Sequence, residues 1–150
     1  MPTIKGNAKH GPPIIRICVL PAVPELLQST SLQNVRDVSS QDCRALLDTG
    51  ADGTSITRAL ADAAGLAYRG KSRTTGISGE TFRRSWTTFL GMYSEEELGQ
   101  LPFLLPEPVL AIEMTPYPKF DVILGRDILM LGDFILKANG DFELSLPSTL

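Results

Sequence analysis

A carboxylate follows directly on a short apolar run in residues 45–52, whose sequence is Ala-Leu-Leu-Asp-Thr-Gly-Ala-Asp. The two leucines indicate the end of a buried strand, so the turn after them presents Asp48 where loops that carry chemistry are found. Gly50 lets the backbone turn tightly, and the Thr49 hydroxyl can both donate and accept a hydrogen bond. A carboxylate held in such a turn can take a proton from water or give one to a leaving group.

Two further segments add to this loop: residues 75–79, Thr-Gly-Ile-Ser-Gly, and residues 121–127, Asp-Val-Ile-Leu-Gly-Arg-Asp. By itself the Asp-Thr-Gly triplet carries little weight, because Asp-x-Gly is a common turn. In the middle segment Ile77 stands between two glycines, and an apolar side chain at a hairpin tip gains nothing from exposure to water. A mobile flap that closes Ile77 over a ligand explains this pattern. An ordinary hairpin with a stray apolar residue is the alternative.

In this order, the three segments resemble those of the retropepsins, the retroviral-type aspartic proteases and their cellular and bacterial relatives. The resemblance extends over about residues 43 to 136 and is strongest in the first and third segments. It implies an all-β fold, mainly antiparallel and closed into a barrel-like acid-protease domain, with two short helices. It also implies a homodimeric endopeptidase that cuts peptide or protein substrates without a metal or another cofactor.

The same resemblance implies roles for individual residues. Asp48 would be the catalytic residue, in an active-site loop completed by Thr49, Gly50 and Ala51. Thr49 would hydrogen-bond across the dimer axis, and Gly50 would let the substrate backbone approach. Asp52 and Arg126 would form an ion pair, stronger than a surface pair, that ties the loop to a later helix. The residues expected to contact substrate are Gly76, Ile77, Phe120 and Ile123.

The chain departs from the viral pattern at two places. Thr75 and Ser78 stand where viral flaps commonly carry glycine, which would stiffen the flap tip. Asn139-Gly140, the strongest short hairpin signal in the chain, extends its C-terminal end. This extension leaves open whether interleaved terminal strands seal the dimer, as they do in the viral enzymes.

Only one Asp-Thr-Gly triplet is present, so a second carboxylate has to come from elsewhere. A residue near a twofold axis meets its own copy, so a homodimer would bring two Asp48 side chains together, and isolated chains would be inactive. Ala51 cannot donate a side-chain hydrogen bond to an ionised carboxylate, as a serine there could, so we expect a mildly acidic pH optimum. Two alternatives stay open: a non-catalytic module that binds an extended peptide or dimerises, and a domain cut from a longer polyprotein.

Other chemistries have weaker support. His10 is the only histidine and lies in the N-terminal stretch, which argues against a Ser/His/Asp or Cys/His mechanism and against a histidine-rich metal site. Asp121 and Asp127 could in principle join Asp48 around a cation. Scattered aspartates more often cap turns or face solvent, so we expect no metal site.

The composition is that of a soluble globular domain, with 43% hydrophobic and 21% charged residues in a chain of 150. A formal net charge of -3 gives no case for a nucleic-acid or anionic-membrane partner. Cys18 and Cys43 lack metal-ligand spacing and are expected to be reduced thiols, with a disulfide as the lesser alternative. Because neither an apolar leader nor a membrane-spanning stretch is visible, we expect a cytoplasmic protein.

The Asp48 loop and residues 75–79 and 121–127 are predicted to lie in one retropepsin-like domain over residues 14–150. A flexible arm is expected over residues 1–13, where glycine and proline stand among polar residues. From Ile56 onward, apolar residues at helical spacing predict a helix of about ten residues that Gly65 ends.

The remaining elements follow from β-rich runs and turn residues. Strands and hairpins are expected at 14–20, 71–86, 86–92, 109–112 and 134–146, with a short helix at 127–131. The connection over residues 21–42 has no role that the sequence reveals, although Pro24–Leu27 could begin a helical turn. Ser94–Glu97 is expected to form a short acidic turn.

Overall fold

The computed structural model describes residues 2–22, 40–94 and 102–147. The helical turn expected at Pro24–Leu27 and residues 95–97 of the expected acidic turn lie outside this part of the chain.

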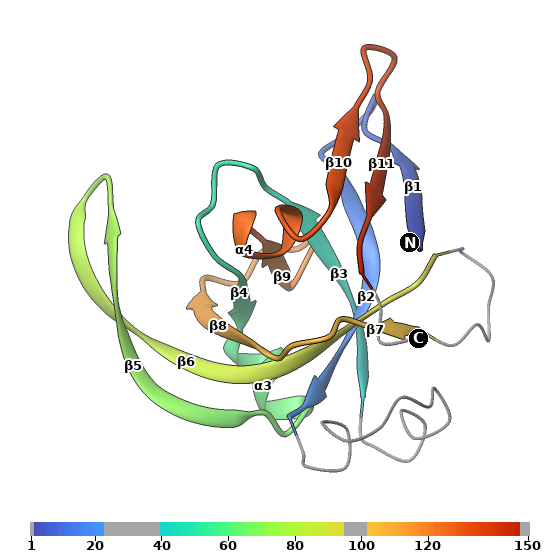
Figure 1. Cartoon of the computed structure of the whole chain (residues 1–150). Helices are drawn as coiled ribbons and strands as arrows, with labels where there is room; N and C mark the ends of the chain where they lie inside the picture. Colours follow the sequence, from blue (N-terminus) through green and yellow to red (C-terminus); the bar gives the residue numbers. More distant parts are fainter. Residues whose placement is uncertain (1, 23–39, 95–101, 148–150) are drawn as a thin grey trace.

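The described residues are mostly β-strand with two short helices, so the predicted fold class is confirmed (Figure 1). The helices are α3 (Arg58–Ala63) and α4 (Arg126–Leu129). The strands are β1 (Thr3–Asn7), β2 (Ile14–Pro21), β3 (Gln41–Leu47), β4 (Ser55–Thr57), β5 (Ala67–Gly76), β6 (Gly79–Met92), β7 (Phe103–Leu104), β8 (Val109–Met114), β9 (Val122–Leu124), β10 (Asp133–Leu136) and β11 (Asp141–Ser145).

The larger sheet closes on itself. Its strands follow the order β2-β3-β9-β4-β8-β6-β5, and β2 also pairs with β6, which completes a ring. The pairings of β3 with β9 and of β4 with β8 are parallel, and the others in this sheet are antiparallel. Closure leaves few open strand edges and gives the loops a rigid base.

The interior of the ring is apolar. Side chains alternate along β2, so that Ile15, Ile17 and Val19 join one buried cluster together with Leu90 of β6 and Leu124 of β9. Leu124 is the last residue of β9 and is fully buried, which fixes the strand end next to the loop after β3. Burial of these side chains is the main stabilising contribution to the fold.

The helix expected from Ile56 onward needs correction at its start, whereas the short helix expected at 127–131 is present as α4. Ile56, expected in a helix, lies in β4, because the backbone of β4 pairs with both β8 and β9. Helix α3 begins only after Thr57, whose hydroxyl accepts a hydrogen bond from the amide of Leu60. Gly65 follows the helix with a φ of 66°, a left-handed conformation that favours glycine.

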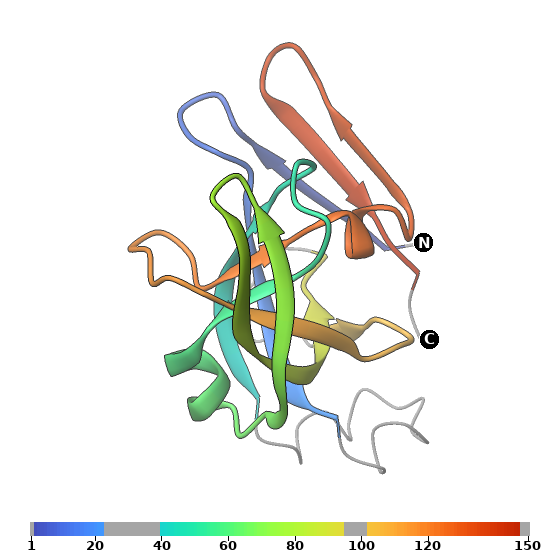
Figure 2. The same cartoon turned by 90° about the vertical axis from the view of Figure 1, so that its left-hand side faces the viewer.

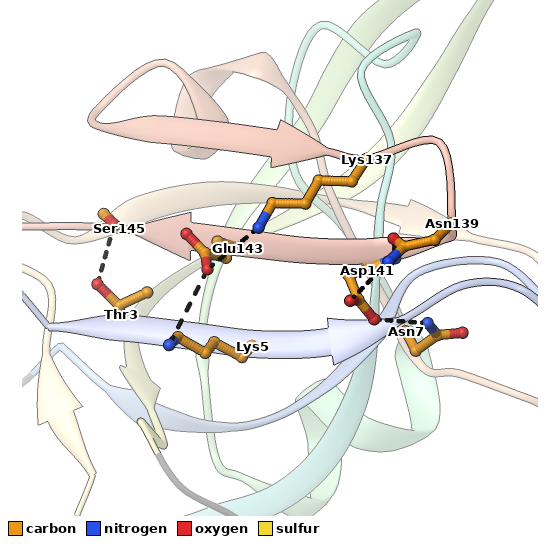
Figure 3. A network of polar contacts seen from close by, with 8 residues as sticks. All are labelled: Thr3, Lys5, Asn7, Lys137, Asn139, Asp141, Glu143 and Ser145. Carbon is orange, nitrogen blue, oxygen red and sulfur yellow. Dashed lines mark hydrogen bonds and ion pairs between the residues drawn. The ribbon is translucent and has the colours of Figure 1, made fainter.

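The prediction of a mobile arm is wrong for residues 3–7, which form β1. This strand pairs antiparallel with β11, from Thr3 opposite Ser145 to Asn7 opposite Asp141. Ile4 is buried, and the opposite face carries a ladder of polar contacts that includes Thr3 with Ser145 and Lys5 with Glu143 (Figure 3). The short run Thr-Ile-Lys-Gly-Asn has only one apolar side chain, so its strand character depends on a partner near the other end of the chain.

The two thiols and one polar cluster lie on β2 and β3 and at the end of β6. Cys18 and Cys43 are free, and burial raises the pKa of Cys18 to about 12. Asp42 accepts hydrogen bonds from Arg16 (2.7 Å) and from the Tyr93 hydroxyl (2.5 Å). Partial burial acts to raise the pKa of Asp42, but these hydrogen bonds outweigh it and hold the pKa below its ordinary value.

Gly6 should be sensitive to any added side chain. A Cβ at this position would lie 2.3 Å from the ring of Phe142, which is buried between β1 and the core, whereas a Cβ at Gly11 would meet nothing within 4 Å. We expect Gly6→Ala to lower the free energy of unfolding by about 1–3 kcal/mol, because Phe142 has to move. Gly11→Ala, the matched control, should change it by less than about 1 kcal/mol. Equal urea midpoints for the two variants would contradict the packing of β1.

The Asp42 cluster predicts a pH-dependent contribution to stability. Because the native pKa is lower than that of the unfolded chain, Asp42 stabilises the fold above about pH 4, and this contribution is lost as the pH falls through the native value. The difference in unfolding free energy between wild type and Asp42→Asn should therefore be largest near neutral pH and should shrink toward about pH 2. Urea titrations at several pH values measure it, with Asp62→Asn on the surface of α3 as the control. A difference that does not change with pH would rule out this contribution.

Candidate active site

Asp48 is the first residue after β3, and its backbone is fixed by the neighbouring strand. β3 and β9 run in parallel, with Leu47 opposite Leu124, and the amide of Asp48 donates to the carbonyl of Leu124 at 3.0 Å. The side chain is partly exposed. One carboxylate oxygen, Oδ1, accepts a hydrogen bond of 2.9 Å from the amide of Gly50, so the loop itself orients the acid.

The loop after Asp48 is held by the residues that lead into α4. The amide of Arg126 donates to the carbonyl of Ala51 at 2.8 Å, and the amide of Asp127 donates to the carbonyl of Asp52 at 3.2 Å. The contact leaves no room for a side chain at Gly125, because a Cβ there would lie 2.5 Å from the carbonyl oxygen of Gly53 and 2.7 Å from that of Ala51. Glycine is therefore required at this crossing.

A second anchor joins Asp127 to Thr54. The Asp127 carboxylate accepts hydrogen bonds from the Thr54 amide (3.0 Å) and from its hydroxyl (3.0 and 3.1 Å). Thr54 is 1% exposed, so this carboxylate satisfies polar groups that water cannot reach. From the sequence, Asp127 is expected to cap a turn or face solvent rather than to bind a cation, and neither Thr54 nor Gly125 is recognised as a positioning residue. The Gly-Arg-Asp order of the third segment carried the signal for Gly125 and Asp127.

Asp52 and Arg126, the residues expected to form an ion pair, lie together. One guanidinium nitrogen of Arg126 contacts the Asp52 carboxylate, and the other, Nη1, donates to the carbonyl of Thr49 at 2.8 Å. The Asp52 side chain is 94% exposed, and only one of its oxygens is bound to Arg126, so within one chain this is a surface pair of small energy. The expected extra strength of this pair is not seen in the single chain. Arg126 nevertheless holds the loop at two points.

A long hairpin stands beside the loop (Figures 1 and 2). β5 and β6 pair out to Gly76 opposite Gly79, and the turn between them leaves Ile77 fully exposed at the tip. Gly79 has a φ of 106°, which favours glycine. Trp86 to Met92, expected as a separate strand, continues this hairpin without a break in β6.

A groove of about 550 Å³ separates the hairpin from the loop. Its walls include Ala51, Asp52 and Thr54 on one side and Arg73, Thr74 and Gly76 on the other. Asp48 does not line this groove, nor do Ile77, Phe120 and Ile123, so only Gly76 of the predicted substrate contacts does.

Phe120 and Ile123 lie in the segment of the chain that leads through β9 into α4. Phe120 packs its ring on Tyr117, with 4.9 Å between the ring centres. Ile123 lies in β9 between Leu46 of β3 and Ser55 of β4, and its side chain is partly exposed. A pocket formed by these two residues stays a prediction.

The other residues considered as catalytic or metal-binding groups lie apart from one another or already form hydrogen bonds. Asp121 accepts a hydrogen bond of 3.4 Å from the Thr57 hydroxyl. His10 is exposed in the turn between β1 and β2. Across residues 2–22, 40–94 and 102–147, no group of three or more histidine, cysteine, aspartate or glutamate side chains is placed to hold a metal ion. Nor does any helix in this part of the chain have the length and apolar character to cross a bilayer.

The sequence matches a family model described as aspartyl protease over residues 35–128. This match covers more than half of the chain and includes the Asp48 loop, the hairpin and the Gly-Arg-Asp segment. The chain therefore belongs to the aspartyl protease family, in agreement with the resemblance to retropepsins. No curated protein matches it.

The Asp127–Thr54 anchor predicts a measurable loss of stability. Asp127→Ala leaves the buried Thr54 hydroxyl and amide without their acceptor, so we expect the free energy of unfolding to fall by about 1–3 kcal/mol. Asp62→Ala removes an exposed carboxylate from α3 and should cost less than about 0.5 kcal/mol. Urea denaturation of both variants measures the difference. Equal losses would show that the Asp127 carboxylate does not hold the loop.

Proposed function

We propose that this chain is one half of a homodimeric aspartic endopeptidase, in which paired Asp48 carboxylates activate a water molecule to hydrolyse peptide bonds. The observation that carries this proposal is the geometry of the Asp48 loop. A partly exposed carboxylate stands at a strand end, its Oδ1 bound to the Gly50 amide and its loop crossed closely by Gly125 and Arg126. Rigid placement of an acid is what proton transfer in a transition state requires.

The pairing of two acids supplies both functions that the reaction needs. Two ionised carboxylates about 3 Å apart would repel by about 5 kcal/mol at an effective dielectric constant near 20, so the pair keeps one proton. The ionised carboxylate takes a proton from water, and the water oxygen attacks the carbonyl carbon. At the same time the protonated carboxyl donates its proton to the carbonyl oxygen, which gives a diol. The acid that took a proton from water then donates it to the amine nitrogen, and the C–N bond breaks. As the carbonyl re-forms, a hydroxyl of the diol returns its proton to the other carboxylate, so the pair again holds one proton.

One chain offers only half of this arrangement. Thr49 and Asp52 beside Asp48 are exposed, so the loop presents a polar surface to a second copy. In a homodimer, Thr49 would hydrogen-bond across the axis, and burial against the partner would strengthen the Asp52–Arg126 pair.

The substrate is proposed to be a peptide bound in an extended conformation between the hairpin and the loop. The groove between these two elements supports it, and the exposed Ile77 at the tip supports closure of a flap over apolar side chains. Phe120 and Ile123 are proposed to line a side-chain pocket. The free thiols Cys18 and Cys43 fit a reducing compartment, which we take to be the cytoplasm.

A non-catalytic peptide-binding or dimerisation module is the second candidate. It is favoured by the walls of the groove, which come from residues 51–55, the β5–β6 hairpin and two residues of β8 and do not include Asp48. Such a module would bind a peptide and leave it intact.

The decisive experiment incubates the purified protein with an unfolded protein substrate between about pH 2 and pH 7, with the maximum expected under mildly acidic conditions. Asp48→Asn should reduce cleavage about a hundredfold or more, and a pepstatin-type inhibitor should block wild-type activity. Asp62→Asn serves as the control and should leave activity unchanged. Because two chains form one site, activity per chain should also fall on dilution.

Cleavage that survives Asp48→Asn would refute the mechanism. A confirmed dimer that cuts nothing across this pH range, but binds peptide, would favour the module. Maximal cleavage below about pH 3 would contradict the role assigned to Ala51.

A further inference from the structure

The hairpin of β5 and β6 turns a polar side toward the groove that separates it from the loop after β3 (Figures 1 and 2). Side chains alternate along β6, so Thr81 and Arg83 point to one side of the hairpin and Phe82 to the other. Thr74 of β5 stands opposite Thr81, and their hydroxyls are 2.9 Å apart. Thr74, Thr81 and Arg83 line the groove, whereas Phe82 does not. A peptide in the groove therefore meets hydroxyls and a guanidinium on this side.

Four charged side chains line the groove, and three of them pair with residues of opposite charge that lie outside it. The three pairs are Asp52–Arg126, Arg73–Glu80 and Glu113–Arg84. The fourth side chain is that of Arg83, which is exposed. In the described part of the chain, no carboxylate is placed to form an ion pair with Arg83. The groove therefore keeps one positive charge that these residues do not neutralise.

Arg83 is held in position by a neutral group. Its Nη1 donates to the backbone carbonyl of Glu113 at 3.2 Å. Glu113 belongs to β8, which pairs with β6 on one side and with β4 on the other, so this carbonyl is part of the sheet. Orientation by a carbonyl leaves the positive charge in place. A guanidinium has five N–H donors in a planar arrangement that fits a carboxylate, so Arg83 has further donors beyond the one used in this contact.

We propose that Arg83 makes the groove selective for a peptide with an aspartate or glutamate side chain, whose carboxylate pairs with the guanidinium. The proposal rests on the proposed function, because it places the substrate peptide between the hairpin and the loop, and it adds the chemical class of one substrate side chain. Charge-assisted hydrogen bonds between guanidinium and carboxylate are stronger than those between neutral groups. A lysine or arginine side chain of the peptide would instead meet a like charge.

The acidic position is separate from the apolar contact at the hairpin tip. Ile77 lies in the turn and does not line the groove, whereas Arg83 lies further down the hairpin, beside β8. From Gly79 to Arg83 the strand rises about 13 Å. Ile77 and Arg83 can therefore contact different residues of one extended peptide.

Matched peptides test the selectivity. Mass spectrometry of a digest of an unfolded protein identifies one cleaved segment, and peptides of this sequence are made with blocked ends, so that only side chains carry charge. Each position near the cut is occupied in turn by glutamate, glutamine or lysine, and the assays run at about pH 5.5, where glutamate is ionised. At one position, wild type should cut the glutamate peptide with a kcat/KM at least about threefold higher than that for the glutamine peptide.

Substitutions of Arg83 test whether it is the source of this preference. Arg83→Gln should bring the two peptides to equal kcat/KM, Arg83→Lys should keep part of the preference, and Arg83→Glu should shift it to the lysine peptide. Lys71→Gln is the matched control, because it removes one positive charge from the same hairpin outside the groove, and it should leave the preference unchanged. A shift toward lysine requires a folded, active protein, so it separates selectivity from a loss of structure.

A binding assay makes the same comparison without cleavage. Overlapping peptides that cover the unfolded protein are arrayed beside copies in which every aspartate and glutamate is replaced by its amide. Labelled Asp48→Asn protein should bind the acidic peptides at least about threefold more tightly than their amide copies. Addition of Arg83→Gln to this variant should remove the difference.

The outcomes separate the selectivity from the catalytic proposal. Selective binding that depends on Arg83, by a protein that cuts nothing, supports the acidic position and refutes the protease. Cleavage that depends on Asp48 but is equally fast on glutamate and glutamine peptides at every position overturns the role of Arg83 and leaves the protease standing. A glutamate preference that survives Arg83→Gln overturns that role as well, and a protein that neither cuts nor binds these peptides overturns both proposals.

Discussion

The crossing of the Asp48 loop by the chain that enters α4 is the contact on which the rest of the site depends. Gly125 passes so close to the carbonyl oxygens of Ala51 and Gly53 that no side chain fits, and the next two amides bind the loop directly. Two segments more than 70 residues apart in the chain are thereby fixed within hydrogen-bonding distance. A catalytic acid needs this rigidity, because small displacements of a reacting group cost large factors in rate.

The closed barrel provides the base for this crossing. β3 and β9 lie side by side in parallel, and each delivers its loop at the same end of the sheet. The buried ends of these strands, Leu47 and Leu124, lie in the apolar core, so the polar loops begin where the core stops. Arg126 and Asp127, both at the start of α4, hold the loop in different ways. Arg126 donates to the exposed Thr49 carbonyl, and the Asp127 carboxylate accepts a hydrogen bond from the buried Thr54.

In the proposed homodimer, each chain would contribute one catalytic acid, Asp48. A site completed by symmetry makes catalysis depend on the free energy of association, so surfaces remote from Asp48 can influence activity. The polar ladder of the terminal sheet ties the two ends of one chain together, and among the residues that the structure describes β10 is left as an edge strand with exposed apolar side chains.

The sequence by itself determined the features that depend on local order: the Asp-Thr-Gly turn after two leucines, the glycines around Ile77, the Asn-Gly hairpin and the Gly-Arg-Asp segment before a short helix. It also indicated the fold class, because short β-rich runs separated by turn residues are a local property. Only the tertiary structure decided that Thr3–Asn7 is a strand, that Ile56 belongs to β4, and that Asp127 serves Thr54. In each of these cases the partner lies far away in the chain, and pairing across such distances overrides local preference because backbone groups must be satisfied wherever they are buried.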